Sequence, residues 1–227
     1  MRVIHILDHS IPLDTTYARQ TLQILASQRA LGWETFQLTG PNQGTGTATE
    51  ERIDGWMFHR TPQPGGILES IPALAALESM GEIAYRIERL AHRVRPHILH
   101  AHSPVINAIP ALRVGRRLGI PVVYEVRAFD PGGSRTRDLP AAVSRRIETW
   151  VLKRADAVMT ACEALRREMV VRGVPAAKVT LTSCADSMVG TATREGGSQA
   201  QSDVSTSDVL HGGRSYCRVY EQLMGAM

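Results

Sequence analysis

The sequence predicts an α/β fold: a Rossmann-like, doubly wound parallel sheet covered by helices on both faces, followed by a disordered or irregular C-terminal tail. Strand-like runs alternate with periodic segments of helix length as far as residue 181. The first run, Met1–Leu7, is rich in Val, Ile and Leu, as expected of a strand buried on both faces. The chain of 227 residues, 43% hydrophobic and 21% charged, is long enough to bury such a core.

In the first half of the chain, a polar loop follows the first strand, and then Leu22, Leu25 and Leu31 recur at helical intervals. Gly32 stands where a helix C-cap falls, and a second helical pattern stops before Pro96. The predicted elements are a strand at Met1–Leu7, a helix at Tyr17–Leu31, strands at Trp33–Leu38 and Ile53–Arg60, and a helix at Ile71–Val94.

The second half repeats this alternation, with Gly119 and Gly173 after two of its helices. Its elements are strands at His97–Ala101, Ile120–Val126, Ala157–Thr160 and Lys178–Leu181, and helices at Val105–Leu118, Pro140–Arg154 and Glu163–Arg172. Ligands of doubly wound sheets bind at the carboxyl ends of the strands, around the reversal of strand order. The loops where a site is expected are those after Leu7, Ala101, Val126 and Thr160.

After Leu181 the sequence changes character. The segment 182–214 is rich in Ser, Thr, Gly and Asp and lacks both helical and alternating periodicity, so it buries too little surface to offset its ordering entropy. A short helix is expected only at Tyr216–Met224. We therefore expect one Rossmann-like domain at 1–181 and a tail of low order at 182–227.

Composition excludes several classes of protein. There is no apolar run of membrane-spanning length and no signal peptide, so we expect a cytoplasmic protein. The cysteines Cys162, Cys184 and Cys217 follow neither a disulfide nor a zinc pattern, so we expect their thiols to be reduced. The net charge is +4, but basic residues are scattered and aromatic residues make up only 5%, which argues against nucleic-acid binding. A basic surface fits peripheral association with an anionic membrane better.

The common enzyme signatures are missing. A dinucleotide site needs Gly-x-Gly-x-x-Gly after the first strand, but the segment 8–13 contains no glycine. The sequence also lacks a Walker loop, a nucleophile elbow and a His-Glu-x-x-His helix.

His97, His100 and His102 form the one histidine cluster in the sequence. His100 and His102 project to the same side of a strand, and His102 falls at the end where ligands bind. A metal site would need a third ligand from elsewhere, so His102 as a hydrogen-bonding group of the crevice is the preferred interpretation, with structural histidines as the alternative.

Three charged residues also stand at the ends of predicted strands. Glu125 could orient or deprotonate a hydroxyl, and Arg127 could hold a phosphate or carboxylate with its planar guanidinium, although the two could equally form an internal ion pair. Glu163 opens a helix, where capping is the alternative to ligand binding.

Several separated segments resemble the N-terminal domain of family 4 glycosyltransferases. They are 2–10, 28–34, 123–129, 148–152 and 154–158, reading RVIHILDHS, QRALGWE, VYEVRAF, ETWVL and RADAV. The match runs from Met1 to about Thr180, and more narrowly it resembles the subgroup associated with the exosortase A system of polysaccharide-producing bacteria.

The resemblance implies the GT-B architecture, in which two Rossmann-like domains face each other across a cleft. It also implies transfer of a sugar, with retention of configuration, from a nucleotide-sugar donor to a glycan or lipid-linked acceptor in exopolysaccharide biosynthesis. No cofactor or metal is expected. Glu125 and His102 are the candidate catalytic residues, and the candidate substrate-binding residues are His9, Ser10, Tyr17, Arg127 and Glu163.

The family's donor-binding domain carries a Glu-x7-Glu motif, and no two glutamates in this chain have that spacing. Three segments depart from the family pattern. Asp14-Thr15-Thr16 stands where a glycine is usual, 130–133 replaces a Trp-Glu-Asp-like run, and 182–187 replaces the linker to the second domain. We therefore expect a truncated chain that lacks the donor domain.

Three hypotheses follow. The first is an acceptor-side glycosyltransferase domain, inactive alone and prone to form a homodimer through the exposed interdomain face. The second is a non-catalytic remnant or glycan-binding module. The third, disfavoured by the motifs, is a nucleotide-sugar epimerase of the same fold.

Overall fold

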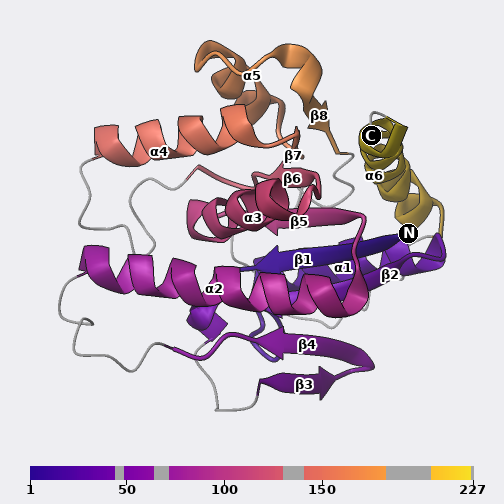
Figure 1. Ribbon diagram of the computed structural model, residues 1–227. Helices are drawn as coiled ribbons and strands as arrows, with labels where there is room; N and C mark the ends of the chain where they lie inside the picture. The colour runs from indigo at the N-terminus through magenta and orange to yellow at the C-terminus, as the bar shows by residue number, and fades with distance from the viewer. Residues whose placement is uncertain (44–48, 64–71, 130–140, 183–205, 226–227) are drawn as a thin grey trace, which may run out of the picture.

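The computed structural model describes residues 1–43, 49–63, 72–129, 141–182 and 206–225 (Figure 1). Its strands are β1 (Arg2–Leu7), β2 (Glu34–Thr39), β3 (Glu50–Ile53), β4 (Trp56–Arg60), β5 (Ile98–His102), β6 (Val122–Glu125), β7 (Ala157–Thr160) and β8 (Val179–Leu181). Its α-helices are α1 (Thr16–Ala30), α2 (Pro72–Val94), α3 (Val105–Leu118), α4 (Ala141–Arg154), α5 (Glu163–Val171) and α6 (Thr206–Gly225).

The strands form one eight-stranded sheet in the order β3-β4-β2-β1-β5-β6-β7-β8. Every neighbouring pair is parallel except β3 with β4. From β1 the chain builds outward through β2 to the β3–β4 hairpin at one edge, then returns to place β5 on the other side of β1 and builds outward to β8. The predicted α/β fold is confirmed. The reversal puts the expected ligand crevice at the carboxyl ends of β1 and β5.

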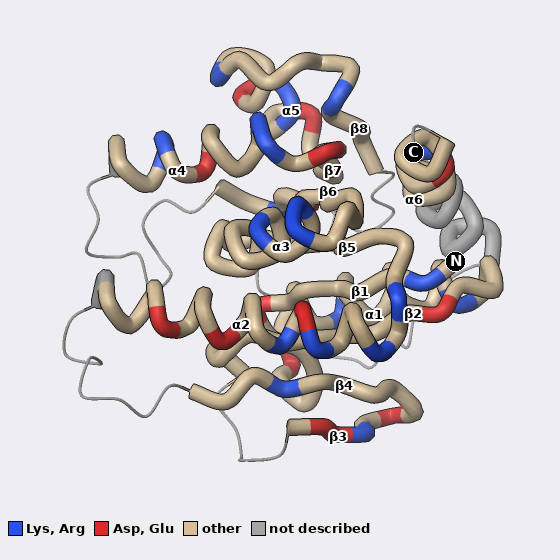
Figure 2. Tube along the Cα trace, viewed as in Figure 1, with Lys and Arg blue, Asp and Glu red and all other residues tan. Residues whose placement is uncertain are grey.

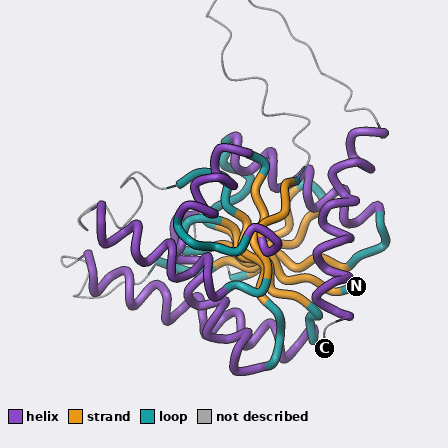
Figure 3. The backbone as a smooth tube through the Cα atoms, turned by 90° about the horizontal axis from the view of Figure 1, so that it is seen from above, coloured by secondary structure: helices purple, strands orange, loops and turns teal. Residues whose placement is uncertain are grey.

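Helices cover both faces of the sheet (Figure 3). On one face, the larger apolar cluster joins Ile4, Ile6 and Leu99 of the strands to α2, α3, α4 and α5. On the other face, a smaller cluster joins Val3 and Val123 to α1 and α6. Because side chains alternate along a strand, His5 and Glu125 share the second face, between the sheet and the pair α1 and α6.

The predicted strand Ile53–Arg60 is wrong in one respect, because the structure has a hairpin there. β3 and β4 pair in antiparallel fashion around Asp54 and Gly55, whose φ angles are 49° and 77°. Two successive left-handed residues make the turn that suits a two-residue hairpin, and Asp-Gly is its usual sequence.

The expectation of a low-order tail needs correction in its last part. The short helix expected at Tyr216–Met224 is present, but α6 begins at Thr206 and covers part of the segment expected to be irregular. Tyr216, Val219 and Tyr220 are buried against the sheet, so tertiary packing stabilises a helix that local periodicity predicted only in part. Residues 183–205, and the predicted loop containing 130–133, lie outside the described part of the chain.

The helices also carry the basic residues shown in Figure 2, several of them along α3 and α4. Among the described helices, none combines the length and apolar character needed to cross a membrane.

Candidate functional site

The residues of the candidate site gather at the pair of strands where strand order reverses. His5 of β1 lies opposite His100 of β5, and His102 of β5 lies opposite Glu125 of β6. All four side chains are at least 93% buried. Arg127 stands two residues after the end of β6 and extends over α1, where its guanidinium lies 4.3 Å from the centre of the Tyr17 ring.

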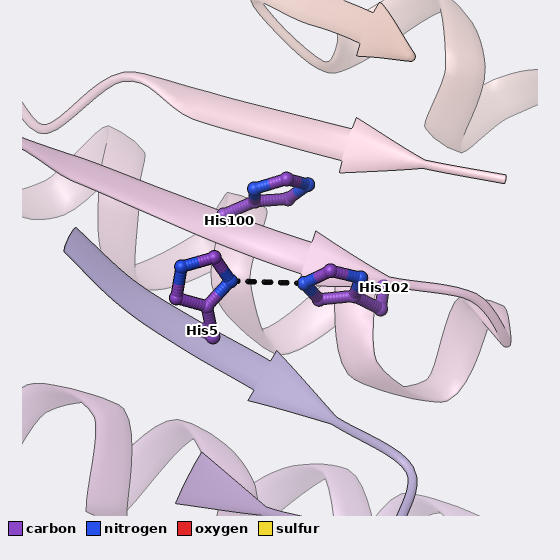
Figure 4. Close-up of side chains that lie close together, drawn as sticks. All are labelled: His5, His100 and His102. Atoms are coloured by element: carbon purple, nitrogen blue, oxygen red, sulfur yellow. Dashed lines mark hydrogen bonds between the residues drawn. The ribbon is translucent and has the colours of Figure 1, made fainter. Parts of the chain in front are cut away.

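The three histidines lie together inside the protein (Figure 4). His5 Nδ1 is 3.0 Å from His102 Nε2, and the rings of His100 and His102 stack with their centres 4.3 Å apart. One ring nitrogen from each lies within 4.8 Å of the others, which is the spacing of a candidate metal site. Two of the three, His100 and His102, belong to the cluster singled out in the sequence. His97 is elsewhere, accepting a hydrogen bond from the Arg2 backbone N–H.

The hydrogen bonds of His102 and His5 have one consistent direction. A guanidinium only donates, so the Arg127 contact at 3.0 Å makes His102 Nδ1 an acceptor and leaves the proton on Nε2. That proton is donated to His5 Nδ1, and His5 in turn donates its Nε2–H to Gln28 Oε1 at 2.8 Å. Both rings are therefore neutral and protonated at Nε2.

The direction continues through α6. Gln28 Nε2 donates to the Tyr220 hydroxyl at 3.4 Å, and that hydroxyl donates to His100 Nδ1. His100 then carries its proton on Nε2, which lies 3.1 Å from Glu125 Oε2. Arg127 Nε donates to the other oxygen of Glu125 at 3.4 Å, which closes the sequence. We call this closed set of side chains the histidine ring; its members are Arg127, His102, His5, Gln28, Tyr220, His100 and Glu125.

Electrostatics agree with these protonation states. Burial, and next the neighbouring His100, lowers the pKa of His5 to about 3. Burial and then the same neighbour hold the pKa of His102 well below its usual value. Burial raises the pKa of Glu125, but the hydrogen bond from His100 and the charge of Arg127 outweigh it and bring that pKa to about 2. His5 and His102 are thus neutral and lie beside the ion pair of Glu125 and Arg127.

The same geometry weighs against metal binding. Five of the six nitrogens of His5, His100 and His102 have a hydrogen-bonding partner, and the sixth, His100 Nε2, has none but lies 3.1 Å from the Glu125 carboxylate. A metal ion would have to displace these partners in a fully buried site, so the arrangement fits a hydrogen-bonded ring better than a set of ligands.

The rim of the crevice is formed by the loop after β1. His9 donates or accepts at both nitrogens, 2.9 Å from Asp8 Oδ2 and 2.8 Å from Thr15 Oγ1, and its ring lies 4.6 Å from that of Tyr17. The side chains of His9 and Arg127 are 20% and 13% exposed, so they reach the surface where the buried histidines do not.

Of the residues predicted from the sequence, Glu125, His102, Arg127 and Tyr17 are in contact within one cluster, and His9 lies next to Tyr17. Ser10 is buried below the rim, where it accepts a hydrogen bond from Arg60 at 2.6 Å. Glu163 stands apart in the first turn of α5, and its described contacts are ion pairs with Arg166 and Arg167 of its own helix rather than capping hydrogen bonds.

The sequence analysis missed several members of the site: His5, Gln28, Tyr216, Tyr220, Arg60 and Gln43, whose side-chain oxygen accepts from the Ser10 backbone N–H at 2.7 Å. One signal was available. His5 is a polar residue in an otherwise apolar strand predicted to be buried on both faces, and a buried polar group needs a partner. No comparable local signal marks Gln28 or the tyrosines of α6, whose partners are about 90 to 190 positions away in sequence.

Comparison with known proteins establishes the family. The model of the glycosyl transferase 4-like domain matches residues 15–185, which is most of the chain. The chain belongs to the glycosyl transferase 4-like domain family. The family-level resemblance inferred from the sequence motifs is thereby confirmed.

Individual relatives agree with this family. The chain is 24% identical, over 179 residues, to a GDP-mannose-dependent alpha-mannosyltransferase of Mycobacterium tuberculosis. That match covers 77% of this glycosyl transferase 4-like chain but only 45% of the relative, so the chain spans less than half the length of that protein.

Solved structures share the fold. Sucrose-phosphate synthase from Thermosynechococcus elongatus matches at a TM-score of 0.62 with 12% sequence identity, and the match covers 99% of both chains. UDP-GlcNAc 2-epimerase of Methanocaldococcus jannaschii matches at a TM-score of 0.52 with 12% sequence identity, and the match covers 80% of this chain and 46% of the epimerase. At these identities, the likeness concerns the fold alone.

Proposed function

We propose that this chain is the acceptor-side domain of a retaining GT-B glycosyltransferase, which receives a glycan or lipid-linked acceptor while a separate domain binds the nucleotide-sugar donor. The observation that carries the proposal is the position of Arg127: in a chain of this family, a partly exposed guanidinium stands at the carboxyl ends of β1 and β5, where doubly wound sheets bind ligands. Arg127 and His9 are then the residues that contact the acceptor.

Arg127 is held firmly enough for this role. Its NH1 donates to the Tyr17 carbonyl and to Thr21 Oγ1, both at 2.9 Å, its NH2 donates to His102, and its Nε donates to Glu125. Four of its five N–H groups thus have partners among the described residues, and the remaining one is available to a phosphate or hydroxyl oxygen of the ligand.

In this proposal the two predicted catalytic residues act through Arg127. Each ring nitrogen of His102 has a protein partner, and both oxygens of Glu125 accept hydrogen bonds, so they position the guanidinium without touching the ligand. The proposal therefore assigns Glu125 and His102 positioning roles instead of the catalytic roles that were expected from the sequence. Ser10 and Glu163 are given no contact with the acceptor.

For the donor, we propose GDP-mannose, on the strength of the mannosyltransferase relative, bound by a domain outside the described residues. We further propose the exosortase-associated subgroup, a role in exopolysaccharide biosynthesis and a cytoplasmic location, in which the free thiols of Cys162 and Cys217 stay reduced.

Peripheral attachment to an anionic membrane is a further part of the proposal. A groove of about 1070 Å³ between α3 and α4 includes Arg113, Arg116, Arg154 and the half-exposed Trp150 in its lining. Basic side chains attract anionic headgroups, and an indole ring suits the membrane interface. The chain should cosediment with phosphatidylglycerol vesicles and not with phosphatidylcholine vesicles, and the double variant R113Q/R116Q should lose that preference. Equal binding to both vesicles would contradict it.

Sugar 1-phosphates test the acceptor site, because they are soluble mimics of lipid-linked sugars. We expect mannose 1-phosphate to shift the amide NMR signals of His9 and Arg127 and to bind more tightly than mannose. Arg127→Gln should abolish the preference for the phosphate, and Arg52→Gln, at an exposed site on β3, should retain it. Shifts confined to other surfaces, or no difference between the two sugars, would refute the assignment.

The glycan-binding module remains the second candidate, favoured by the full engagement of His102 and Glu125 inside the protein. Mannose transfer from GDP-mannose to the same sugar phosphates separates the two functions. Turnover by the chain alone would contradict both the module and the separate donor domain, whereas binding without turnover, even with a donor domain supplied, would favour the module.

A further inference from the structure

The histidine ring is incomplete without the C-terminal helix. Tyr216 and Tyr220 lie one helical turn apart on the buried side of α6, and each hydroxyl ends in the ring. Tyr216 donates to Glu125 Oε2 at 3.0 Å, and Tyr220 connects Gln28 to His100. A segment about a hundred positions downstream in sequence therefore supplies two of the hydrogen bonds of the candidate site.

The hydroxyl groups are not needed for packing. Val219 and Leu223 of α6, together with the two tyrosine rings, already fill the apolar cluster on this face of the sheet. Tyr220 also stacks on Trp33, with the ring centres 5.1 Å apart. Phenylalanine at both positions would keep these contacts, so the hydroxyls themselves must account for any effect on the ring.

Each hydroxyl controls a different group. The Tyr220 hydroxyl is the donor that makes His100 Nδ1 an acceptor and so directs the His100 proton towards Glu125. The Tyr216 hydroxyl occupies Glu125 Oε2, which leaves Oε1 to the Nε–H of Arg127. The orientation of the guanidinium thus depends on how α6 fixes the carboxylate.

We propose that Tyr216 and Tyr220 are positioning residues, which set the proton positions in the histidine ring and the orientation of Arg127 at the crevice. The inference rests on the proposed function only where it gives Arg127 a ligand. Docking of α6 and competence of the crevice are then coupled, because a displaced α6 leaves His100 without its donor and Glu125 with a free oxygen.

Side-chain NMR of the full chain tests the proposal directly. In the wild-type protein, the 15N signals of His5 and His102 should show the neutral form with the proton on Nε2, and those of His100 should show a protonated Nε2. Tyr220→Phe should change the tautomer signature of His100, and Tyr216→Phe should shift the Nε–H signal of Arg127. Unchanged imidazole and guanidinium signals in folded forms of both variants would overturn the proposal.

Two control variants separate positioning from packing. Leu223→Ala removes packing from α6 without touching the ring, so it should lower the melting temperature and leave the side-chain signals in place. Tyr85→Phe removes a hydroxyl from an exposed site on α2 and should change neither property. If Leu223→Ala altered the ring signals as strongly as the tyrosine variants do, the effect would be one of packing and the proposal would fail.

Ligand binding gives an independent measurement. Tyr216→Phe should weaken mannose 1-phosphate binding roughly tenfold, which is the effect expected when the hydrogen bond that orients Glu125, and through it Arg127, is lost. If the ring signals respond as expected but the wild-type chain binds no sugar phosphate, the proposed function fails and the positioning role stands. If binding is normal in both variants, Arg127 does not need α6 and the proposal is wrong.

Discussion

Glu125→Gln is the most informative single substitution, because it removes the one buried negative charge of the histidine ring and keeps the shape of the side chain. The carboxylate accepts from Tyr216 and Arg127 and faces the Nε2–H of His100. An amide has one oxygen and an NH2 group, so one of these donors would face another donor, and Arg127 would lose its counter-charge.

The size of the effect follows from the pKa of this carboxyl group. Its pKa falls from the usual 4.5 to about 2 in the folded protein, which corresponds to about 3 kcal/mol of stability at neutral pH. The folded state binds fewer protons than the unfolded state between these values. The contribution is therefore present in full above pH 4.5 and is lost as the pH falls towards 2.

Urea unfolding of the wild type and of Glu125→Gln at several pH values measures this contribution. The variant should be less stable by about 3 kcal/mol at pH 7, and the difference should narrow to about 2 kcal/mol at pH 3.5. Glu221→Gln, at an exposed position on α6, should stay within about 0.5 kcal/mol of the wild type. A difference that does not vary with pH, or one below about 1 kcal/mol at pH 7, would refute the assignment of a buried carboxylate.

Three further outcomes are expected. Arg60→Met should lower the free energy of unfolding by about 2–4 kcal/mol, because the buried Arg60 guanidinium holds the loop after β1 through hydrogen bonds to Ser10 and Ile11. Urea unfolding measures this, and Arg52→Met, at an exposed position, is the control that should show no such loss. The pKa values of His5 and His102 are lowered in the folded protein, so below pH 6.5 the unfolded state binds more protons than the folded state. The free energy of unfolding should therefore decrease from pH 6.5 towards pH 3, by up to about 5 kcal/mol for His5. A urea midpoint that stays constant between pH 7.5 and 5 would contradict this. The predicted homodimer should weaken in Leu77→Glu, since Leu77 is 60% exposed in the N-terminal half of α2. Light scattering that finds only monomer in the wild type would exclude the homodimer.

Much of the fold could be predicted because its signals are local. The Val/Ile/Leu-rich run at the start of the chain and the helical periods closed by Gly32 and Gly119 depend only on neighbouring residues. The hairpin at Asp54 and Gly55 also had its local signal, an Asp-Gly pair inside the predicted strand, and could have been found.

The candidate site could be predicted only in outline. His102, Glu125 and Arg127 stand at strand ends, and the topology rule for doubly wound sheets was enough to single them out. Their protonation states could not be predicted, because these depend on Gln28 and Tyr220, which only the packing of α1 and α6 brings into place. Glu163 met the same strand-end criterion, yet α5 pairs it with its own arginines.

The histidine ring also explains why the exposed part of the site is so small. With His5 and His102 neutral, the charge of Glu125 is balanced by that of Arg127 within the ring. Within the ring, only the Arg127 guanidinium both takes part in this ion pair and reaches the rim of the crevice. A lysine there could not satisfy Tyr17, Thr21, His102 and Glu125 together, since an ammonium has three donors and no planar geometry. The protein interior therefore requires an arginine at this position for its own hydrogen bonds, and the contact with a ligand uses the one N–H group that is not bonded to these protein groups.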